Sequence, residues 1–173
     1  MTSPSPAIAD TSSALSALCR IGQLEILRLR FPLVIVPRTV RMELEAADDR
    51  NLIGMIDQAC EAGWMRVADS SMSDWQAPIS RLGPGETAAL ALAVAMPEAV
   101  LLMDERRGRR AARMLGLTTT GVLGLLMWAK QSGHLDSLAQ AIHDLHTKDS
   151  FFIDPELLRQ ALTAVGEELE GPL

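Results

Sequence analysis

The stretch Ala99-Val-Leu-Leu-Met-Asp104 is the clearest buried strand in the sequence, and it ends on an acidic residue. It is short, apolar and partly β-branched, which favours a strand that is covered on both faces. Four more short strand candidates occur along the chain, at residues 7–9, 33–36, 64–68 and 117–120. Helical patterns separate these segments. The sequence therefore predicts an α/β fold with a central parallel sheet of about five strands.

The helical patterns also have predictable limits. Pro37 is expected at the first position of a helix that continues through residues 39–47, because its fixed φ suits that position. Residues 69–81 are polar and include Pro78, which indicates a surface loop. Further helices are expected at residues 51–61, 83–96, 105–115, 122–131, 136–146 and 155–169.

Length and composition bound the organisation of the chain. With 173 residues and 48% hydrophobic content, it is long enough for one good core and too short for two ordinary domains. We therefore expect a single domain over residues 1–173, with its core at about 7–168 and flexible ends at 1–6 and 170–173.

The length of the apolar runs and the number of cysteines indicate where the protein is located in the cell. The apolar runs fall short of the roughly 20 residues that cross a bilayer, so we expect no membrane span and a cytoplasmic location. Cys19 and Cys60 lie in helical patterns and are expected to be reduced, buried thiols.

Charge is distributed unevenly. The formal net charge is −6, which argues against a protein that coats nucleic acid through bulk positive charge. Five of the fourteen arginines nevertheless fall in residues 106–113, directly after Asp104. Any contact with phosphate must therefore be local, and this segment is its candidate.

Acidic residues are placed where a parallel sheet gathers its ligands. Asp10 and Asp104 follow predicted strands, and Glu86 lies in the first turn of a predicted helix. Ligands of such sheets bind outside the carboxyl ends of the strands. Clustered carboxylates without lysine partners suit hard cations such as Mg²⁺ or Mn²⁺, which can activate water at a scissile phosphate. By spacing alone, each acid could equally be a helix cap or a solvated charge.

Two other classes of acidic site fit the residues poorly. A phosphorelay receiver domain needs a second acid beside Asp10 and a lysine at the end of a late strand, whereas Lys130 and Lys148 lie in helical or linker context. A phosphatase with an Asp-x-Asp-x-Thr nucleophile needs an acid at position 12, which is Ser12.

Several motifs in series resemble the PIN-domain proteins of the DUF3368 group, over about residues 7–168. The resemblance is carried by Ile8-Ala-Asp-Thr-Ser12, Ile35-Val-Pro-Arg-Thr-Val-Arg-Met-Glu-Leu44, Leu82-Gly-Pro-Gly-Glu-Thr-Ala-Ala-Leu90, Leu101-Leu-Met-Asp-Glu-Arg-Arg-Gly-Arg-Arg110, Gly121-Val-Leu-Gly-Leu-Leu-Met-Trp-Ala-Lys130 and Gly166-Glu167. Several motifs in the same order are far more specific than any one of them.

This resemblance implies a three-layer α/β/α fold and a Mg²⁺- or Mn²⁺-dependent ribonuclease, in the manner of the toxins of type II toxin–antitoxin pairs. The residues that match the family's metal-binding acids are Asp10, Glu43, Glu86 and Asp104. Thr11 or Ser12 resembles the hydroxyl that supports the first acid. Relatives often have proline where Ser13 stands and threonine where Val122 stands, and neither departure removes a carboxylate.

The remaining expectations concern residues around these acids. Glu105 is expected to face outward, because successive residues diverge. Arg106, Arg109, Arg110 and Arg113 lie on or near one helix face and are candidates for binding the phosphodiester backbone, with a solvated face or pairing to an acidic partner as the alternatives.

Other side chains offer weaker signals. His143 and His146 are expected to be a surface pair and not a zinc site, because no third ligand is placed nearby. Trp128 and Trp64 are expected to pack, which leaves Trp75 in the polar loop as a candidate for base stacking.

The leading hypothesis is thus an endoribonuclease acting on RNA, with a small antitoxin protein as a partner. Apolar helices at residues 14–29 and 50–60 leave room for a homodimer. The alternatives are a housekeeping RNA-processing nuclease and a PIN-like module that binds RNA or protein with weak or no catalysis.

Overall fold

The structure is a computed structural model that describes residues 5–9, 12–70, 77–79, 81–149 and 151–168. Its centre is a five-stranded parallel sheet in the order β3-β2-β1-β4-β5. The strands are β1 (Ala7–Ala9), β2 (Val34–Pro37), β3 (Met65–Ala68), β4 (Val100–Leu102) and β5 (Thr118–Thr120). The predicted α/β class and the parallel sheet of five strands are confirmed.

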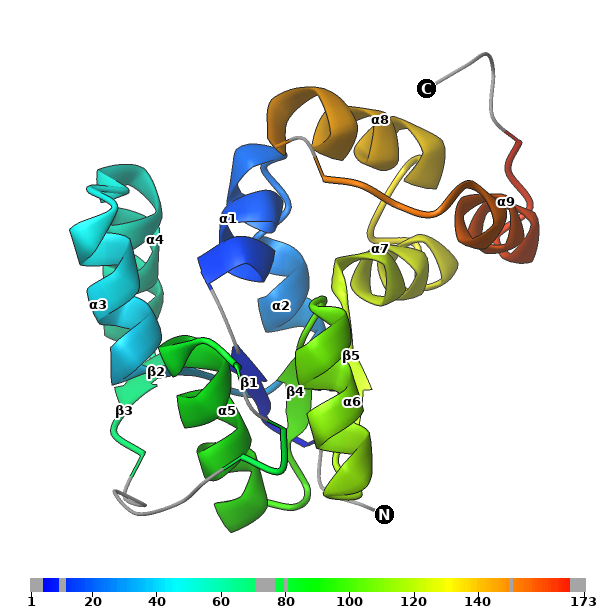
Figure 1. The fold of residues 1–173 in the computed structure, drawn as a ribbon. Helices are drawn as coiled ribbons and strands as arrows, with labels where there is room; N and C mark the ends of the chain where they lie inside the picture. The colour runs from blue at the N-terminus through cyan, green and yellow to red at the C-terminus, as the bar shows by residue number, and fades with distance from the viewer. Residues whose placement is uncertain (1–4, 10–11, 71–76, 80, 150, 169–173) are drawn as a thin grey trace.

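Helices cover both faces of this sheet (Figure 1). They are α1 (Ser12–Arg20), α2 (Glu25–Arg30), α3 (Arg38–Ala46), α4 (Arg50–Glu61), α5 (Pro84–Ala95), α6 (Arg106–Met114), α7 (Val122–Gln131), α8 (Leu138–Asp149) and α9 (Pro155–Ala164). In the view of Figure 1, α1, α2, α7 and α8 lie above the strands and α5 lies below them, and α5 and α6 share one hydrophobic core. The arrangement is a three-layer α/β/α fold.

Alternation along the strands explains why two helix layers form. Ala7 and Ala9 of β1 belong to the core shared with the layer that contains α1, α2, α7 and α8, whereas Ile8 belongs to the core shared with α5 and α6. Leu102 and Leu101 of β4 divide in the same way. Successive side chains of a strand point to opposite faces, so an apolar strand requires cover on both.

One boundary expected from the sequence is wrong. Pro37 is not the first residue of a helix, because it ends β2 in register with Ala68 of β3 and has ψ 140°. The continued pairing with β3 keeps this residue extended, and α3 begins one residue later, at Arg38.

The two last helices also differ from their expected bounds. Helix α9 ends at Ala164, short of residue 169, because Gly166 adopts φ +74° and the Glu167 N–H donates to the Leu162 carbonyl. Such a left-handed turn satisfies the last carbonyls of a helix. Helix α8 begins at Leu138, two residues later than expected, and continues to Asp149.

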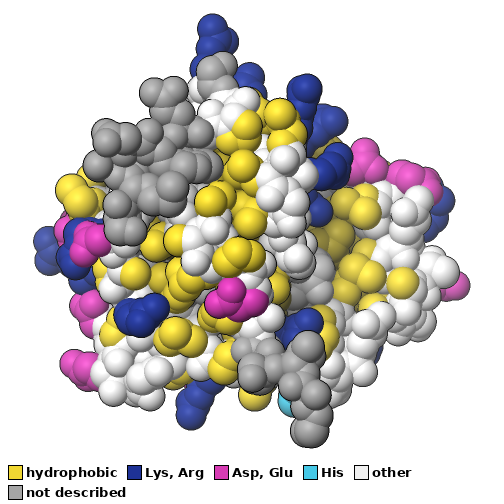
Figure 2. All heavy atoms as spheres, turned by 90° about the horizontal axis from the view of Figure 1, so that it is seen from below, with side chains coloured by type: hydrophobic (Ala, Val, Ile, Leu, Met, Phe, Trp, Pro, Cys, Tyr) yellow, Lys and Arg dark blue, Asp and Glu magenta, His cyan; other side chains and the backbone are white. Residues whose placement is uncertain are grey.

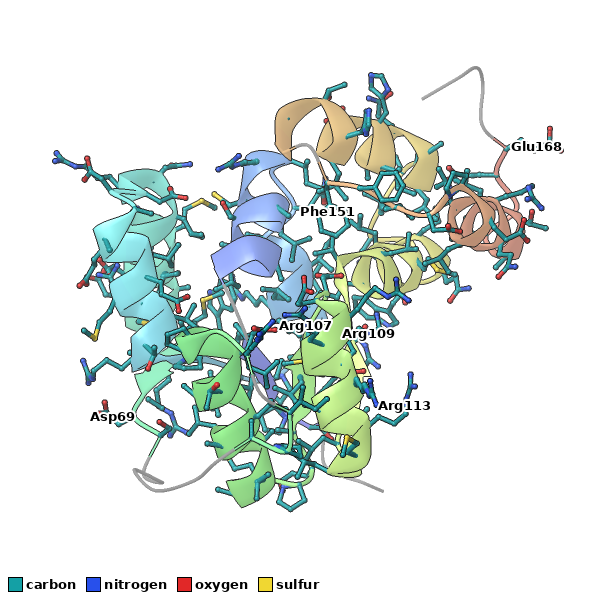
Figure 3. All side chains as sticks on the ribbon, in the orientation of Figure 1. Asp69, Arg107, Arg109, Arg113, Phe151 and Glu168 are labelled. Carbon is teal, nitrogen blue, oxygen red and sulfur yellow. The ribbon has the colours of Figure 1, made fainter. Side chains whose placement is uncertain are left out.

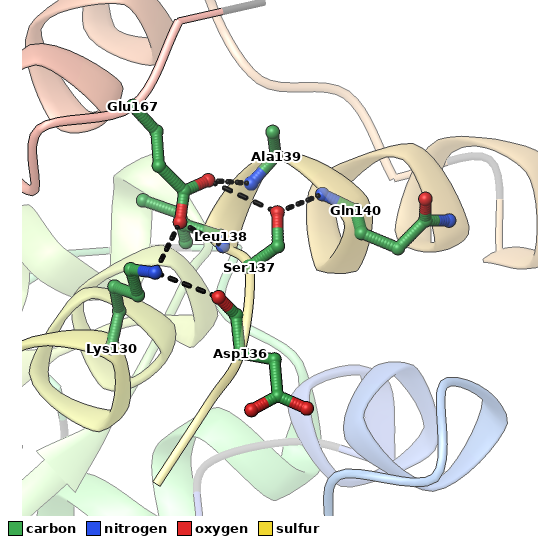
Figure 4. A network of polar contacts seen from close by, with 7 residues as sticks. All are labelled: Lys130, Asp136, Ser137, Leu138, Ala139, Gln140 and Glu167. Atoms are coloured by element: carbon green, nitrogen blue, oxygen red, sulfur yellow. Dashed lines mark hydrogen bonds and ion pairs between the residues drawn. The ribbon is translucent and has the colours of Figure 1, made fainter. Parts of the chain in front are cut away.

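A polar network explains where α8 begins (Figure 4). The Glu167 carboxylate, 15% exposed, accepts hydrogen bonds from the N–H groups of Leu138 (3.0 Å) and Ala139 (2.8 Å) and from the Ser137 hydroxyl (3.1 Å). Lys130 of α7 pairs with it at 2.8 Å. The residue after the α9 turn therefore caps α8, and three segments meet at one carboxylate.

The helices of the described ranges were compared with the length and hydropathy that a membrane span requires. None of the helices there is both long enough and apolar enough to cross a bilayer.

Candidate active site

The candidate site lies where the order of the sheet reverses. β1 and β4 are neighbours, with Ala9 in register with Leu102, although the chain passes through β2 and β3 between them. Crevices for ligands form at such points, outside the carboxyl ends of the strands. Asp104 follows β4 by two residues. Asp10 follows Ala9 in the sequence, but Asp10 and Thr11 lie outside the described residues, as does the Ser12 side chain.

Asp104 is held against the amino end of α7. Its two carboxylate oxygens lie 3.1 and 3.2 Å from the N–H of Val122, which donates to them. Gly121 permits this approach, because a Cβ at that position would lie 2.3 Å from Asp104 Oδ1. Asp104 is therefore fixed by backbone contacts that no larger residue at position 121 would allow.

Burial dominates the electrostatics of Asp104. Removal from water raises the pKa of this carboxyl to about 6, although the Val122 N–H and the nearby positive charge of Arg109 act to lower it. The cost of a buried negative charge is thus only partly offset by its neighbours. A cation placed beside Asp104 would relieve that cost.

Glu86 is the buried acid of the site, with 8% of its surface exposed. One oxygen, Oε2, accepts a hydrogen bond from the Gly83 N–H at 2.7 Å, which caps the start of α5. The other, Oε1, is buried and has no hydrogen-bond partner among the residues that the structure describes. It lies against α6, where a Cβ on Gly108 would be 2.8 Å away. Glycine at position 108 therefore leaves room for this oxygen between the two helices.

Glu43 reaches the same helix end from α3. It is half-buried, and its Oε1 accepts a hydrogen bond from the Gly85 N–H at 3.0 Å. Glu43 and Glu86, which are 43 positions apart in sequence, therefore both bind the first turn of α5, where unpaired N–H groups favour negative charge.

The structure thus brings the described acids to two neighbouring helix ends, Glu43 and Glu86 at α5 and Asp104 at α7. Within the described part of the chain, no three acidic, histidine or cysteine side chains gather closely enough to hold a metal ion. The donor chemistry nevertheless suits a hard divalent cation, since the groups are carboxylates and one buried oxygen of Glu86 is unpartnered. Glu105, the residue before α6, is exposed.

Five arginines line a cavity of about 430 Å³ on α6, the helix that begins two residues after Asp104. All of them belong to α6 and are exposed; they are Arg106, Arg107, Arg109, Arg110 and Arg113. No described acidic side chain forms an ion pair with any of them. Figure 2 views the molecule from below Figure 1 and shows basic side chains gathered at the upper right, on the α6 side. The four expected arginines therefore share one cavity.

Arg107 was not among the arginines predicted from sequence to bind phosphate, because it lies about 100° from Arg106 around the helix. It lines the same cavity nonetheless. Gly108 and Gly121 were also not singled out as parts of the site, because only the tertiary structure shows which carboxylate approaches each of them.

Comparison with known protein families assigns the chain to a family. The family model described as DUF3368, PIN domain, matches residues 6–167. The chain belongs to the PIN-domain family. It therefore has a nuclease fold, of a kind that typically uses divalent metal ions. Comparison of this PIN domain with curated proteins gave no match.

Histidine, tryptophan and cysteine signals from the sequence lie outside the site. His143 and His146 of the PIN domain are both exposed on α8. Trp128 packs against the core, with its ring 5.6 Å from that of His134. Trp64 is also packed there, and Trp75 lies outside the described residues.

The two cysteines of the PIN domain are free thiols and half-buried, where full burial was expected. Burial raises the pKa of Cys19 and of Cys60, which disfavours the reactive thiolate at both positions.

Proposed function

We propose that this PIN domain is a Mg²⁺- or Mn²⁺-dependent endoribonuclease that hydrolyses phosphodiester bonds of RNA. The observation that carries the proposal is the Glu86 carboxylate, whose buried Oε1 has no hydrogen-bond partner within the described part of the chain. Leaving a charged oxygen buried and unpaired is costly. A divalent cation bound there would satisfy it, and the neighbouring acids are of the kind such cations prefer.

Asp10, Glu43, Glu86 and Asp104 are the residues that would hold the ion. When bound, the ion would neutralise charge on the phosphate and lower the pKa of the attacking water. A hydroxyl of Thr11 or Ser12 would support the first acid. The helix ends of α5 and α7 fix the carboxylates of Glu86 and Asp104 before any ligand arrives, which lowers the cost of ordering them.

Substrate binding is assigned to the α6 arginines. Arg106, Arg109, Arg110 and Arg113 would contact the phosphodiester backbone, since guanidinium groups bind phosphate through paired hydrogen bonds. Their charges form no ion pair with the described acids, and in a chain of net charge −6 they would concentrate attraction for RNA at the α6 cavity.

The test is cleavage of a mixed RNA pool with Mg²⁺ or Mn²⁺, against the same reaction with chelator. Asp10→Asn and Asp104→Asn should each lower the cleavage rate by about 100-fold or more, as loss of a metal ligand does. Glu25→Gln, an exposed acid on α2, is the matched control and should cleave normally. Cleavage that survives chelation, or full activity in either asparagine variant, contradicts the site.

A second function has its own observation in favour. The described acids already serve as partners of backbone N–H groups in α5 and α7, so they can be explained without a metal. Under this alternative, the PIN domain binds RNA or a protein without useful catalysis. RNA binding that is tight while Mg²⁺ and Mn²⁺ leave the melting temperature unchanged would favour it.

We further propose a role as the toxin of a type II toxin–antitoxin pair, supported by the family alone. Expression should arrest growth unless a small antitoxin protein is co-expressed, and harmless expression would favour housekeeping RNA processing. A homodimer stays a prediction as well. Leu15, Leu18, Leu52 and Ile56 of the helices expected to form it are buried within this chain, whereas Leu29 at the end of the first segment is exposed.

A further inference from the structure

Arg107 is an exposed residue in the first turn of α6 and directly precedes the residue at which α6 meets α5. The next residue, Gly108, meets Glu86 of α5 so closely that a Cβ would lie 2.8 Å from its unpartnered Oε1. In Figure 3 the Arg107 side chain points from the first turn of α6 toward α5. Its exposed guanidinium also lines the arginine cavity.

Arg109 occupies the other side of the same helix. Its Nη1 would lie 3.5 Å from a Cβ on Gly121, the position that contacts Asp104. Its charge also helps to lower the pKa of Asp104, against the larger effect of burial. Arg109 is therefore already opposite an acid, whereas Arg107 forms no ion pair with any acid that the structure describes.

The other arginines lie farther along α6. At about 1.5 Å of rise per residue, Arg113 is about 9 Å beyond Arg107 along the helix axis. The two side chains therefore start more than one turn apart, which favours contacts with different phosphates of a bound strand.

We propose that Arg107 contacts the phosphate that is cleaved, while Arg110 and Arg113 hold flanking phosphates of a bound RNA strand. This inference rests on the proposed ribonuclease function. A guanidinium aimed at the phosphate binds two of its oxygens, and it stabilises the charge that builds up there as the bond breaks. Arg107 is suited to this role because its charge is not paired with any acid that the structure describes, and because its side chain points toward α5, the helix that carries Glu86.

The decisive experiment separates cleavage from binding. Single-turnover cleavage of a short RNA oligonucleotide is measured at saturating protein with Mn²⁺, and binding of the same oligonucleotide is measured in chelator over a range of salt. We expect Arg107→Ala to lower the saturated cleavage rate by about 100-fold, the usual effect of removing one donor to a transition state. We expect its affinity for the oligonucleotide to change less than tenfold.

Two further variants sharpen this result. Arg107→Lys should recover only part of the rate, because an ammonium lacks the planar fork of a guanidinium. Arg113→Ala should instead weaken binding and reduce the slope of log affinity against log salt by about one, as loss of a phosphate contact does. Arg28→Ala, an exposed arginine on α2 paired with Glu25, is the matched control and should change neither quantity.

Arg107→Ala that cleaves at the wild-type rate under saturation would overturn the inference. If the wild-type protein does not cleave RNA at all, the proposed function fails. The binding data then decide whether Arg107 contacts a phosphate. A salt slope reduced by about one in Arg107→Ala would then still show a phosphate contact. An unchanged slope would refute it, including the case in which α6 binds an acidic protein surface in place of RNA.

Discussion

The acidic side chains of this site are held in place by short contacts between their carboxylates and backbone N–H groups. Asp104 illustrates the consequence, because it is desolvated and its pKa is raised to about 6. A carboxyl with a folded pKa above its unfolded value favours the fold fully below about pH 4. That contribution is lost as the pH rises through about 6. The proposed site is therefore less stable at neutral pH than a neutral side chain would make it.

Asp104→Asn should expose this cost. Asparagine has nearly the same shape and its carbonyl oxygen can still accept the Val122 N–H. We expect the metal-free variant to melt a few degrees above wild type at pH 7.5, and the difference to shrink at pH 4, while cleavage is lost. Thermal melts at both pH values, with chelator present, measure this. A lower melting temperature for the variant at pH 7.5 would show that the charge is compensated.

Gly121 should be as sensitive as the acid it contacts. In Gly121→Ala the added Cβ would lie 2.3 Å from Asp104 Oδ1, so the carboxylate must move and its bond to Val122 is lost. We expect at least a tenfold loss of cleavage and of Mn²⁺ affinity, since a displaced donor misplaces the reacting groups. Gly54→Ala on α4 is the control, because nothing lies within 4 Å of its added Cβ. Equal effects of the two variants would contradict this account.

At the scale of elements, helix ends organise the molecule. The first turns of α5 and α7 bind the candidate site acids, and the start of α8 binds Glu167 in the same manner. Burial raises the pKa of Glu167, but the Lys130 ion pair and the Ala139 and Leu138 N–H groups outweigh it and lower the pKa to about 2. A carboxylate that accepts hydrogen bonds from the first N–H groups of a helix therefore occurs both at the candidate site and where the C-terminal segment packs against α8.

Glu167→Gln should therefore destabilise the fold without changing the site. The folded pKa is below the unfolded value near 4.5, so this contribution is present above about pH 4.5 and is lost as the pH falls toward 2. We expect a loss of about 1–3 kcal/mol in the free energy of unfolding at pH 7, and a smaller difference from wild type at pH 3. Glu168→Gln, at the exposed neighbouring residue, is the control for denaturant melts. A pH-independent difference would argue against the ion pair as its source.

For the whole molecule, the distribution of charge matters more than its sum. A net charge of −6 does not favour binding of RNA at large, but α6 presents five arginines without an ion-pair partner among the described acids. Repulsion from the rest of the surface would restrict an RNA strand to this cavity. The cavity lies on α6, the helix that follows β4 and Asp104 in the chain.

The strands and their parallel arrangement could be predicted from sequence, because short apolar runs alternating with helical patterns have few other ways to bury both faces. Segments 7–9 and 99–103 were expected as strands and contain β1 and β4. Boundaries were less certain. Pro37 was misplaced because pairing with Ala68 keeps it in the sheet, and α9 ends early because Gly166 turns the chain.

By itself, the sequence determined the fold class and the family, since these depend on local pattern and order, and it predicted the acids that follow the strands. Only the tertiary structure decided that Glu43 of α3 and Glu86 meet at one helix end, and that Arg107 lines the cavity. Such contacts join segments that are distant in sequence. Their formation depends on how closely the helices approach one another, which local periodicity does not encode.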